Sequence, residues 1–239
     1  MLDVPADNPI ILVTGFVRSP GDGSDPSGDL LQLLAADPPG GVDLRTQLLP
    51  IDWESALLKA IEAMDRLFPD AVIGLGLAEG QPILCVERVA INLNDRETPV
   101  REGRAGRSEP IDAAGPAAYF STLPVHSMVE RMRAGGIAAS VSNSAGAQLS
   151  NRLFYALLHY VSLRGQETWF KKEPPAGLTS RIGFIRLPAS PRPAAGRKKE
   201  PPALALETSL RGVSLAIEAV TAFLASPGAK AAAGSSATE

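Results

Sequence analysis

The chain has 239 residues, 45% of them hydrophobic, and a formal net charge of −3. This length and composition suffice for one sizeable core, and the weakly acidic, interspersed charge argues against nucleic acid as a main partner. A single cysteine excludes an internal disulfide and is typical of a reducing compartment. We find neither an apolar run of about 18 residues nor a basic N-terminal segment, so we expect no membrane span and no signal peptide, and place the protein in the cytoplasm.

Apolar strands alternate with amphipathic helices along the chain. In chain order, we predict a strand at 10–14, a helix at 29–36, an edge strand at 42–50, a helix at 54–67, strands at 71–75 and 84–90, a helix at 125–134, a strand at 137–141, a helix at 151–164, a strand at 182–186 and a final helix from about 206. The spacing at 54–67 is that of a helix packed on a sheet, and the continuous apolar run at 71–75 indicates a strand covered on both faces. This order predicts one three-layer α/β/α domain over residues 1–226, with an open mixed sheet and a site outside the strand ends.

The connecting segments are rich in proline, glycine or charge. Residues 19–28 are predicted to form a loop, and so are 101–109 and 189–202, for which binding of an acidic partner is the alternative. The Ala/Gly/Ser tail at 227–239 is predicted to be disordered. The sequence has no visible repeat or metal-ligand cluster, and we expect no cofactor.

A strand end, a turn of small residues and a helix start follow one another at 141–160, with the helix beginning near Ser150. The free backbone N–H groups of a helix start favour negative charge, so this is a position at which an enzyme can place a nucleophile. A serine hydroxyl needs a positioned general base, because its ionisation near neutral pH costs on the order of 12 kcal/mol and a helix start returns at most about 2 kcal/mol. The structural alternative is that Ser150 is an N-cap.

The sequence offers few bases for Ser150. His159 lies on the same predicted helix at a rise of about 13.5 Å, which excludes direct contact. His126 stands at another helix start, where a surface or cap role is favoured, and Lys171 and Lys172 precede two prolines in a solvated loop. Cys85 is expected to be an inert core thiol.

Several sequence blocks resemble, in order, those of pyroglutamyl peptidase I, a family of cysteine peptidases that remove an N-terminal pyroglutamate. The most specific block is Glu87–Asp95; Ser142–Tyr160 and Gly183–Pro188 are among those that follow it, and the whole series spans roughly residues 9 to 225. The resemblance implies a phosphorylase/hydrolase-like α/β fold and an oligomeric assembly.

The family triad is glutamate, cysteine and histidine, and the resemblance places these positions on Glu87, Ser150 and Arg186. Two of the three residues therefore differ from the family pattern. Arginine cannot act as a base, because guanidinium stays protonated in proteins. Glu87 would also lack the imidazole that such a carboxylate orients.

The family's substrate pocket is also altered at the positions that the resemblance identifies. Phe16 is kept as one aromatic wall, whereas the second aromatic is replaced by Ser19. The family's glutamine and arginine in the glycine-rich block correspond to Leu77 and Gln81. Recognition of pyroglutamate is therefore questionable as well as catalysis.

Two outcomes are open for Arg186. In the first, it forms a charge-assisted, bidentate pair with Glu87 that locks the structure in place of a catalytic relay. In the second, Arg186 and the helix start near Ser150 hold a small anion or a carboxylate.

We therefore interpret the chain as a pyroglutamyl peptidase homologue whose hydrolysis is absent or severely reduced, retained for binding a small peptide or carboxylate ligand or for assembly as a homo-oligomer. The alternative is an active hydrolase that uses Ser150 and removes an N-terminal pyroglutamate or a related cyclic amide.

Overall fold

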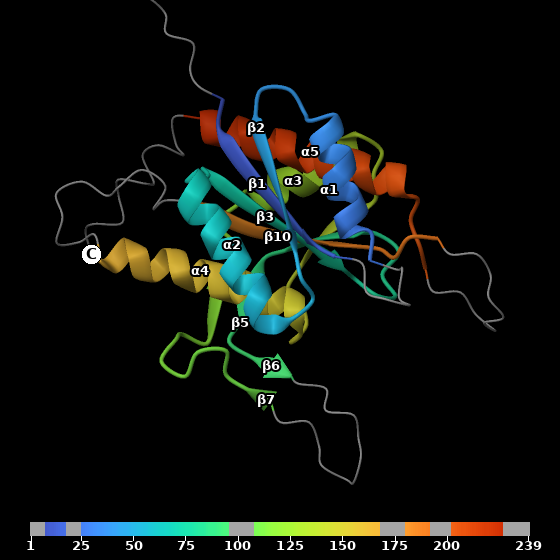
Figure 1. Ribbon diagram of the computed structural model, residues 1–239. Coiled ribbons are helices and arrows are strands. Elements are labelled where there is room, and N and C mark those ends of the chain that lie inside the picture. Colours follow the sequence, from blue (N-terminus) through green and yellow to red (C-terminus); the bar gives the residue numbers. More distant parts are fainter. Residues whose placement is uncertain (1–7, 18–24, 96–107, 168–179, 192–201, 227–239) are drawn as a thin grey trace, which may run out of the picture.

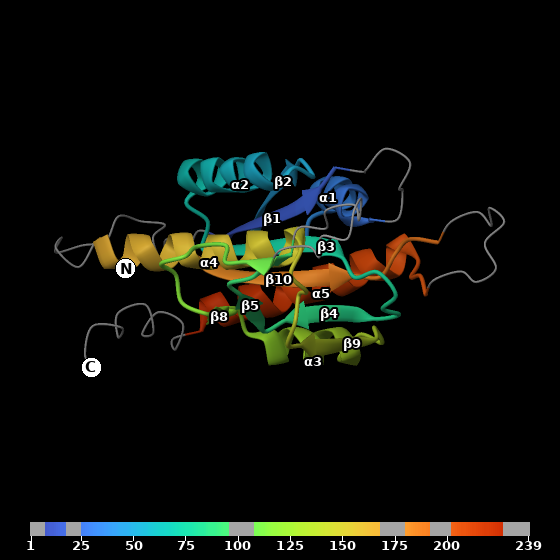
Figure 2. The same ribbon diagram turned by 90° about the horizontal axis from the view of Figure 1, so that it is seen from below.

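A six-stranded sheet in the order β2-β1-β3-β10-β4-β9 forms the centre of the molecule (Figures 1 and 2). The computed structural model describes residues 8–17, 25–95, 108–167, 180–191 and 202–226. The strands of this sheet are β1 (Ile10–Phe16), β2 (Asp43–Leu49), β3 (Ala71–Leu77), β4 (Leu84–Glu87), β9 (Ala139–Ser142) and β10 (Arg181–Leu187). The pair β10–β4 is antiparallel and every other neighbouring pair is parallel, so the predicted mixed sheet is confirmed.

Helices cover both faces of the sheet, as the sequence predicts (Figure 1). They are α1 (Ser27–Ala36), α2 (Trp53–Leu67), α3 (Val125–Ala134), α4 (Leu149–Glu167) and α5 (Leu206–Ala225). α2 and α4 pack on one face, with Phe154 and Phe184 in their core. α1, α3 and α5 pack on the other, with Met128 and Ile217 in theirs.

Identifiable residues mark both ends of α2 and the end of α3. Asp52 caps α2, because its carboxylate accepts the N–H groups of Glu54 and Ser55. α2 ends at Phe68, which adopts a left-handed conformation with φ 47°. The glycine pair after α3 ends that helix as predicted, and Gly136 has φ 80°.

The predicted strand at 84–90 is instead two strands that belong to different sheets. β4 ends at Glu87, and β5 (Val89–Ile91) pairs with β8 (Ala118–Phe120). Between them, Arg88 donates its N–H to Ser142 O and accepts the N–H of Ser121, so its backbone connects the two sheets. The sequence predicted one strand because apolar residues stand on both sides of Glu87 and Arg88, although β4 is buried throughout and β5 only in part.

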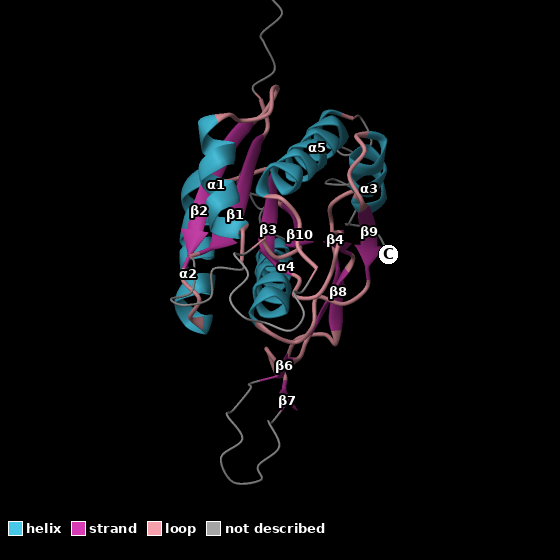
Figure 3. Cartoon of the chain, turned by 90° about the vertical axis from the view of Figure 1, so that its right-hand side faces the viewer, coloured by secondary structure: helices cyan, strands magenta, loops and turns pink. Residues whose placement is uncertain are grey.

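A short arm was also missed. β6 (Asn94–Asp95) pairs with β7 (Ser108–Glu109), and this pair projects away from the central sheet (Figures 1 and 3). The predicted loop at 101–109 is therefore wrong at its last two residues, where pairing to β6 supplies a partner that lies far along the sequence.

The expectation that no segment is apolar enough for a membrane span needs correction at α5, which passes that test by length and composition. α5 nevertheless packs on the sheet and against α3, with Val213, Ala216, Ile217 and Val220 buried. An apolar helix that covers a sheet has this composition without spanning a bilayer. Residues 96–107, 168–179, 192–201 and the tail 227–239 lie outside the described part of the chain. The predictions for Lys171, Lys172 and that tail therefore stay predictions.

Candidate active site

The pairing register brings two of the three family positions onto one face of the sheet. Arg186 of β10 pairs with Gly76 of β3 and with Cys85 of β4, and Phe184 pairs with Glu87. Paired residues share a face, and side chains along a strand alternate between faces. Arg186, Cys85 and Glu87 therefore lie on the side that α4 covers.

Ser150, in the first turn of α4, lies over this same face of the sheet. A Cβ placed on Gly76 would lie 2.6 Å from Ser150 Oγ, so the hydroxyl occupies space that the missing side chain leaves free. Gly76 is the strand partner of Arg186, so Ser150 lies over the strand next to the one that carries Arg186. The three residues that the resemblance assigns to the triad thus lie on the same side of the sheet.

Ser150 is not an N-cap, contrary to the structural alternative. α4 begins at Leu149, and its first backbone bond runs from Arg152 N–H to Gln148 O. Gln148 therefore occupies the N-cap position. Ser150 lies two residues further on, inside the first turn of the helix. The sequence pattern located the helix start within two residues but not the cap itself.

Glu87 and Arg186 form the ion pair that the first outcome requires. Arg186 Nε donates to Glu87 Oε1 at 2.9 Å. The Glu87 side chain is fully buried, whereas that of Arg186 is 20% exposed. The contact is not bidentate: within the described residues Glu87 Oε2 has no hydrogen-bond partner, and Arg186 Nη2 donates instead to Ser144 O at 3.4 Å.

The Ser150 hydroxyl lacks an activating group. Among the residues that the structure describes, no hydrogen bond joins Ser150 Oγ to an imidazole, a carboxylate or an amine. The cation beside it cannot accept a proton. This arrangement can orient or bind a polar group, but it does not provide the proton transfer that an attacking serine needs.

Asn151 is a functional-site residue that sequence reasoning missed. It is fully buried, and its amide group accepts the N–H of Ile91 and donates to the carbonyls of Ile91 and Leu93. These bonds join the first turn of α4 to the segment that directly follows Glu87 and Arg88. Asn151 thereby fixes Ser150 relative to Glu87. A lone asparagine in a helix start carries no sequence signal for such a contact.

The other residues considered as nucleophile or base lie apart from Ser150 or are inactive. Cys85 is 6% exposed, burial raises the pKa of its thiol, and the thiol donates to Ile83 O at 3.7 Å. His159 is bound to Asp112 and Tyr119, further along α4. His126 is exposed in the first turn of α3, on the other side of the sheet.

The pocket positions are only partly assembled. Phe16 is 3% exposed and belongs to the core under α2 and α4, on the side of Ser150. Leu77 pairs with Leu187, whose side chain lies in the opposite core. Gln81 is exposed, and its N–H donates to Ala78 O. Ser19 lies outside the described residues, so the role of these four in ligand binding stays a prediction.

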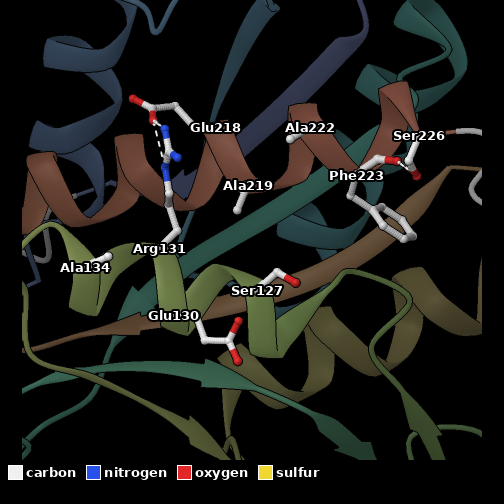
Figure 4. A pocket seen from close by; sticks show the side chains of 9 residues that line it. All are labelled: Ser127, Glu130, Arg131, Ala134, Glu218, Ala219, Ala222, Phe223 and Ser226. Carbon is white, nitrogen blue, oxygen red and sulfur yellow. Dashed lines mark hydrogen bonds and ion pairs between the residues drawn. The ribbon is translucent and has the colours of Figure 1, made fainter.

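A separate groove lies between α3 and α5 on the opposite face of the sheet (Figure 4). Its walls carry the ion pair Arg131–Glu218 and the carboxylate of Glu130, and Phe223 closes one end. None of the predicted site residues lines it. In the described ranges, no group of three His, Cys, Asp or Glu side chains is placed to hold a metal ion.

Comparison with known proteins places this arrangement in context. The profile of the family described as pyroglutamyl peptidase matches residues 10–222. The pyrrolidone-carboxylate peptidase 1 of Photorhabdus laumondii is 37% identical over 209 residues, which cover 87% of this chain and 90% of the relative. The pyrrolidone-carboxylate peptidase of Cupriavidus taiwanensis is 38% identical over 213 residues, which cover 87% and 91%.

Solved structures agree with the sequence relatives. Pyroglutamyl peptidase I of Bacillus amyloliquefaciens superposes with a TM-score of 0.75 at 32% identity, over 90% of this chain and 97% of that one. A mutant pyrrolidone carboxyl peptidase of Pyrococcus furiosus gives a TM-score of 0.77 at 31% identity, over 90% and 99%.

Proposed function

Because the chain belongs to the pyroglutamyl peptidase family, we propose that it is a member whose peptide-bond hydrolysis is absent or severely reduced. It keeps the family's fold and binds a small peptide or carboxylate ligand at the site of Ser150, Glu87 and Arg186. The names of its relatives point to a pyroglutamyl, or pyrrolidone carboxylate, group as the ligand.

One observation carries this proposal: the side chain that pairs with Glu87, at the position that the resemblance assigns to the histidine of the triad, is a guanidinium. In a hydrolytic triad, an imidazole at this place removes the proton of the nucleophile and returns it to the leaving group. Arg186 can do neither, because a guanidinium stays protonated in proteins. Without a base, the cost of forming the alkoxide adds to the barrier of the reaction.

The remaining parts of the site support binding. Phe16 lies in the core on the same side of the sheet as Ser150. The first turn of α4 presents backbone N–H groups, which stabilise a carbonyl or carboxylate oxygen. Asn151 holds that turn in place. We further propose that the protein acts in the cytoplasm and as a homo-oligomer, with no nucleic-acid or membrane partner.

A fluorogenic pyroglutamyl amide separates this proposal from an active serine hydrolase. We expect the wild-type protein to release no more fluorophore than Ser150→Ala, under conditions in which pyroglutamyl peptidase I of Bacillus amyloliquefaciens turns the same substrate over. Wild-type turnover that Ser150→Ala abolishes would contradict the proposal. It would establish Ser150 as the nucleophile of an omega-peptidase or amide hydrolase.

A further inference from the structure

The guanidinium of Arg186 makes only some of the hydrogen bonds that it can donate. Its Nε is committed to Glu87, and its Nη2 makes one long contact of 3.4 Å with Ser144 O. No hydrogen bond of Nη1 is present among the described residues. With its side chain 20% exposed, Arg186 can therefore offer its terminal amino groups to a ligand.

Glu87 sets the direction in which those groups point. Its side chain is completely buried and takes only the Nε of Arg186. The terminal amino groups are thereby turned toward the exposed turn that contains Ser144 and leads into α4. The buried carboxylate of Glu87 therefore orients the guanidinium of Arg186 toward the turn that precedes α4.

Further hydrogen-bond donors converge on the same place. The first helical bond of α4 is donated by Arg152, so the N–H groups of Leu149, Ser150 and Asn151 lie before the helical ladder. The Ser150 hydroxyl lies above Gly76, beside Arg186. Glu87 has one oxygen occupied by Arg186 and the other buried away from solvent, so the groups that face a ligand here are mainly donors.

We propose that this site prefers the carboxylate of a small free acid over the uncharged amide of a peptide. This inference rests on the proposed function, since it names the ligand of the same non-hydrolytic site. A carboxylate presents two oxygens and a full charge to the guanidinium and the helix start, and charge-assisted hydrogen bonds are about twice as strong as neutral ones. An amide presents one neutral oxygen to the same donors, so it makes no ionic contact with the guanidinium.

Isothermal titration calorimetry with 2-pyrrolidone-5-carboxylate and with its carboxamide tests the preference on the wild-type protein. We expect the acid to bind at least about tenfold more tightly than the amide, and its affinity to fall with added salt because the contact is ionic. Equal binding of the two compounds, tighter binding of the amide, or no binding of the acid would each overturn the inference.

Variants identify the group responsible. Arg186→Gln should remove the preference for the acid, Arg186→Lys should keep part of it, and Arg211→Gln should leave it unchanged, since Arg211 is an exposed arginine on α5. If Arg186→Gln does not fold, the Arg186→Lys variant still tests the role of Arg186, and the comparison of acid with amide on the wild-type protein still tests the preference. A preference that persists in a folded Arg186→Gln protein would overturn the assignment.

Failure of this inference is distinguishable from failure of the proposed function. A protein that binds the amide without cleaving it, and ignores the acid, would retain the proposed function and lose only the inference. Turnover of the fluorogenic amide that depends on Ser150 would instead contradict the proposed function itself.

Discussion

Two polar clusters on the same helix show what catalysis requires of geometry. At the start of α4, Ser150 has a buried carboxylate nearby but a cation where a base is needed. Further along, His159 bonds Asp112 at 3.1 Å and Tyr119 at 2.7 Å, so an imidazole and a carboxylate are in place without a serine. His159 follows Ser150 by nine positions, which amount to about 13.5 Å of helix. The chain thus contains every chemical type of a hydrolytic triad, but divides them between two sites.

The largest effect should come from rebuilding a complete triad at the first cluster. Ser150→Cys combined with Arg186→His places a low-pKa nucleophile beside an imidazole that Glu87 can orient. We expect hydrolysis of a pyroglutamyl amide to rise by about 10²–10⁴-fold over the wild type, which is the usual contribution of a general base.

The single variants serve as controls for that experiment and should stay near background. Full activity of Ser150→Cys alone would show that Arg186 does not prevent hydrolysis. A double variant that folds but stays inactive would show that the altered pocket around Phe16 also prevents hydrolysis.

The second effect concerns stability and should be confined to the first cluster. Arg186→Met leaves the carboxylate of Glu87 buried without its counter-ion, so we expect the free energy of unfolding to fall by about 3 kcal/mol. Urea denaturation measures it. The double variant Glu87→Gln with Arg186→Met should recover part of the loss, because it removes the orphaned charge. A loss below about 0.5 kcal/mol in the single variant would mean that Glu87 is more hydrated than its burial indicates.

Alkaline pH should act beside the second cluster, on Tyr155, whose ring stacks on His159 and contacts Tyr119. Burial raises the pKa of Tyr155 to about 12. Since the folded pKa lies above the unfolded value of about 10, the stabilisation is complete below pH 10 and is lost as the pH rises toward 12. The expected loss is up to about 2 kcal/mol, measured by denaturation at several pH values.

Tyr155→Phe should flatten part of this pH dependence. Tyr160, whose pKa burial also raises to about 12, contributes the remainder. An unchanged alkaline slope in the phenylalanine variant would remove Tyr155 as its cause.

The smallest effect should come from Asp112→Asn in the second cluster. The Asp112 side chain is 40% exposed, so its pair with His159 is screened by water, and we expect the free energy of unfolding to change little. Calorimetric binding of 2-pyrrolidone-5-carboxylate should be unchanged. A weakened affinity would show that the two clusters are coupled through α4.

The sequence predicted the parts of the fold that depend on local signals. The alternation of apolar strands and helices, the end of α3 at the glycine pair and the edge position of β2 all follow from patterns within a few residues. The break at Arg88 and the pairing of β6 with β7 could not be predicted, because each depends on partners remote in the chain.

The sequence was enough to predict which residues form the site, but not which contacts they make. The positions of Glu87, Ser150 and Arg186 came from the family resemblance, and the ion pair followed from their charges. The use of a single nitrogen of Arg186, the placement of Ser150 inside the first turn and the three bonds of Asn151 depend on side-chain directions. No residue pattern specifies those directions.

Gly76 lets α4 lie close to the sheet. A methyl group there would lie 2.6 Å from the seryl oxygen and 3.2 Å from the ring of Phe184, so the Ser150 side chain would have to turn to another rotamer or α4 would have to shift. Gly76→Ala therefore moves the hydroxyl while it leaves the charges of Glu87 and Arg186 unchanged. The affinity of this variant for 2-pyrrolidone-5-carboxylate would report how much of ligand recognition depends on the position of that hydroxyl.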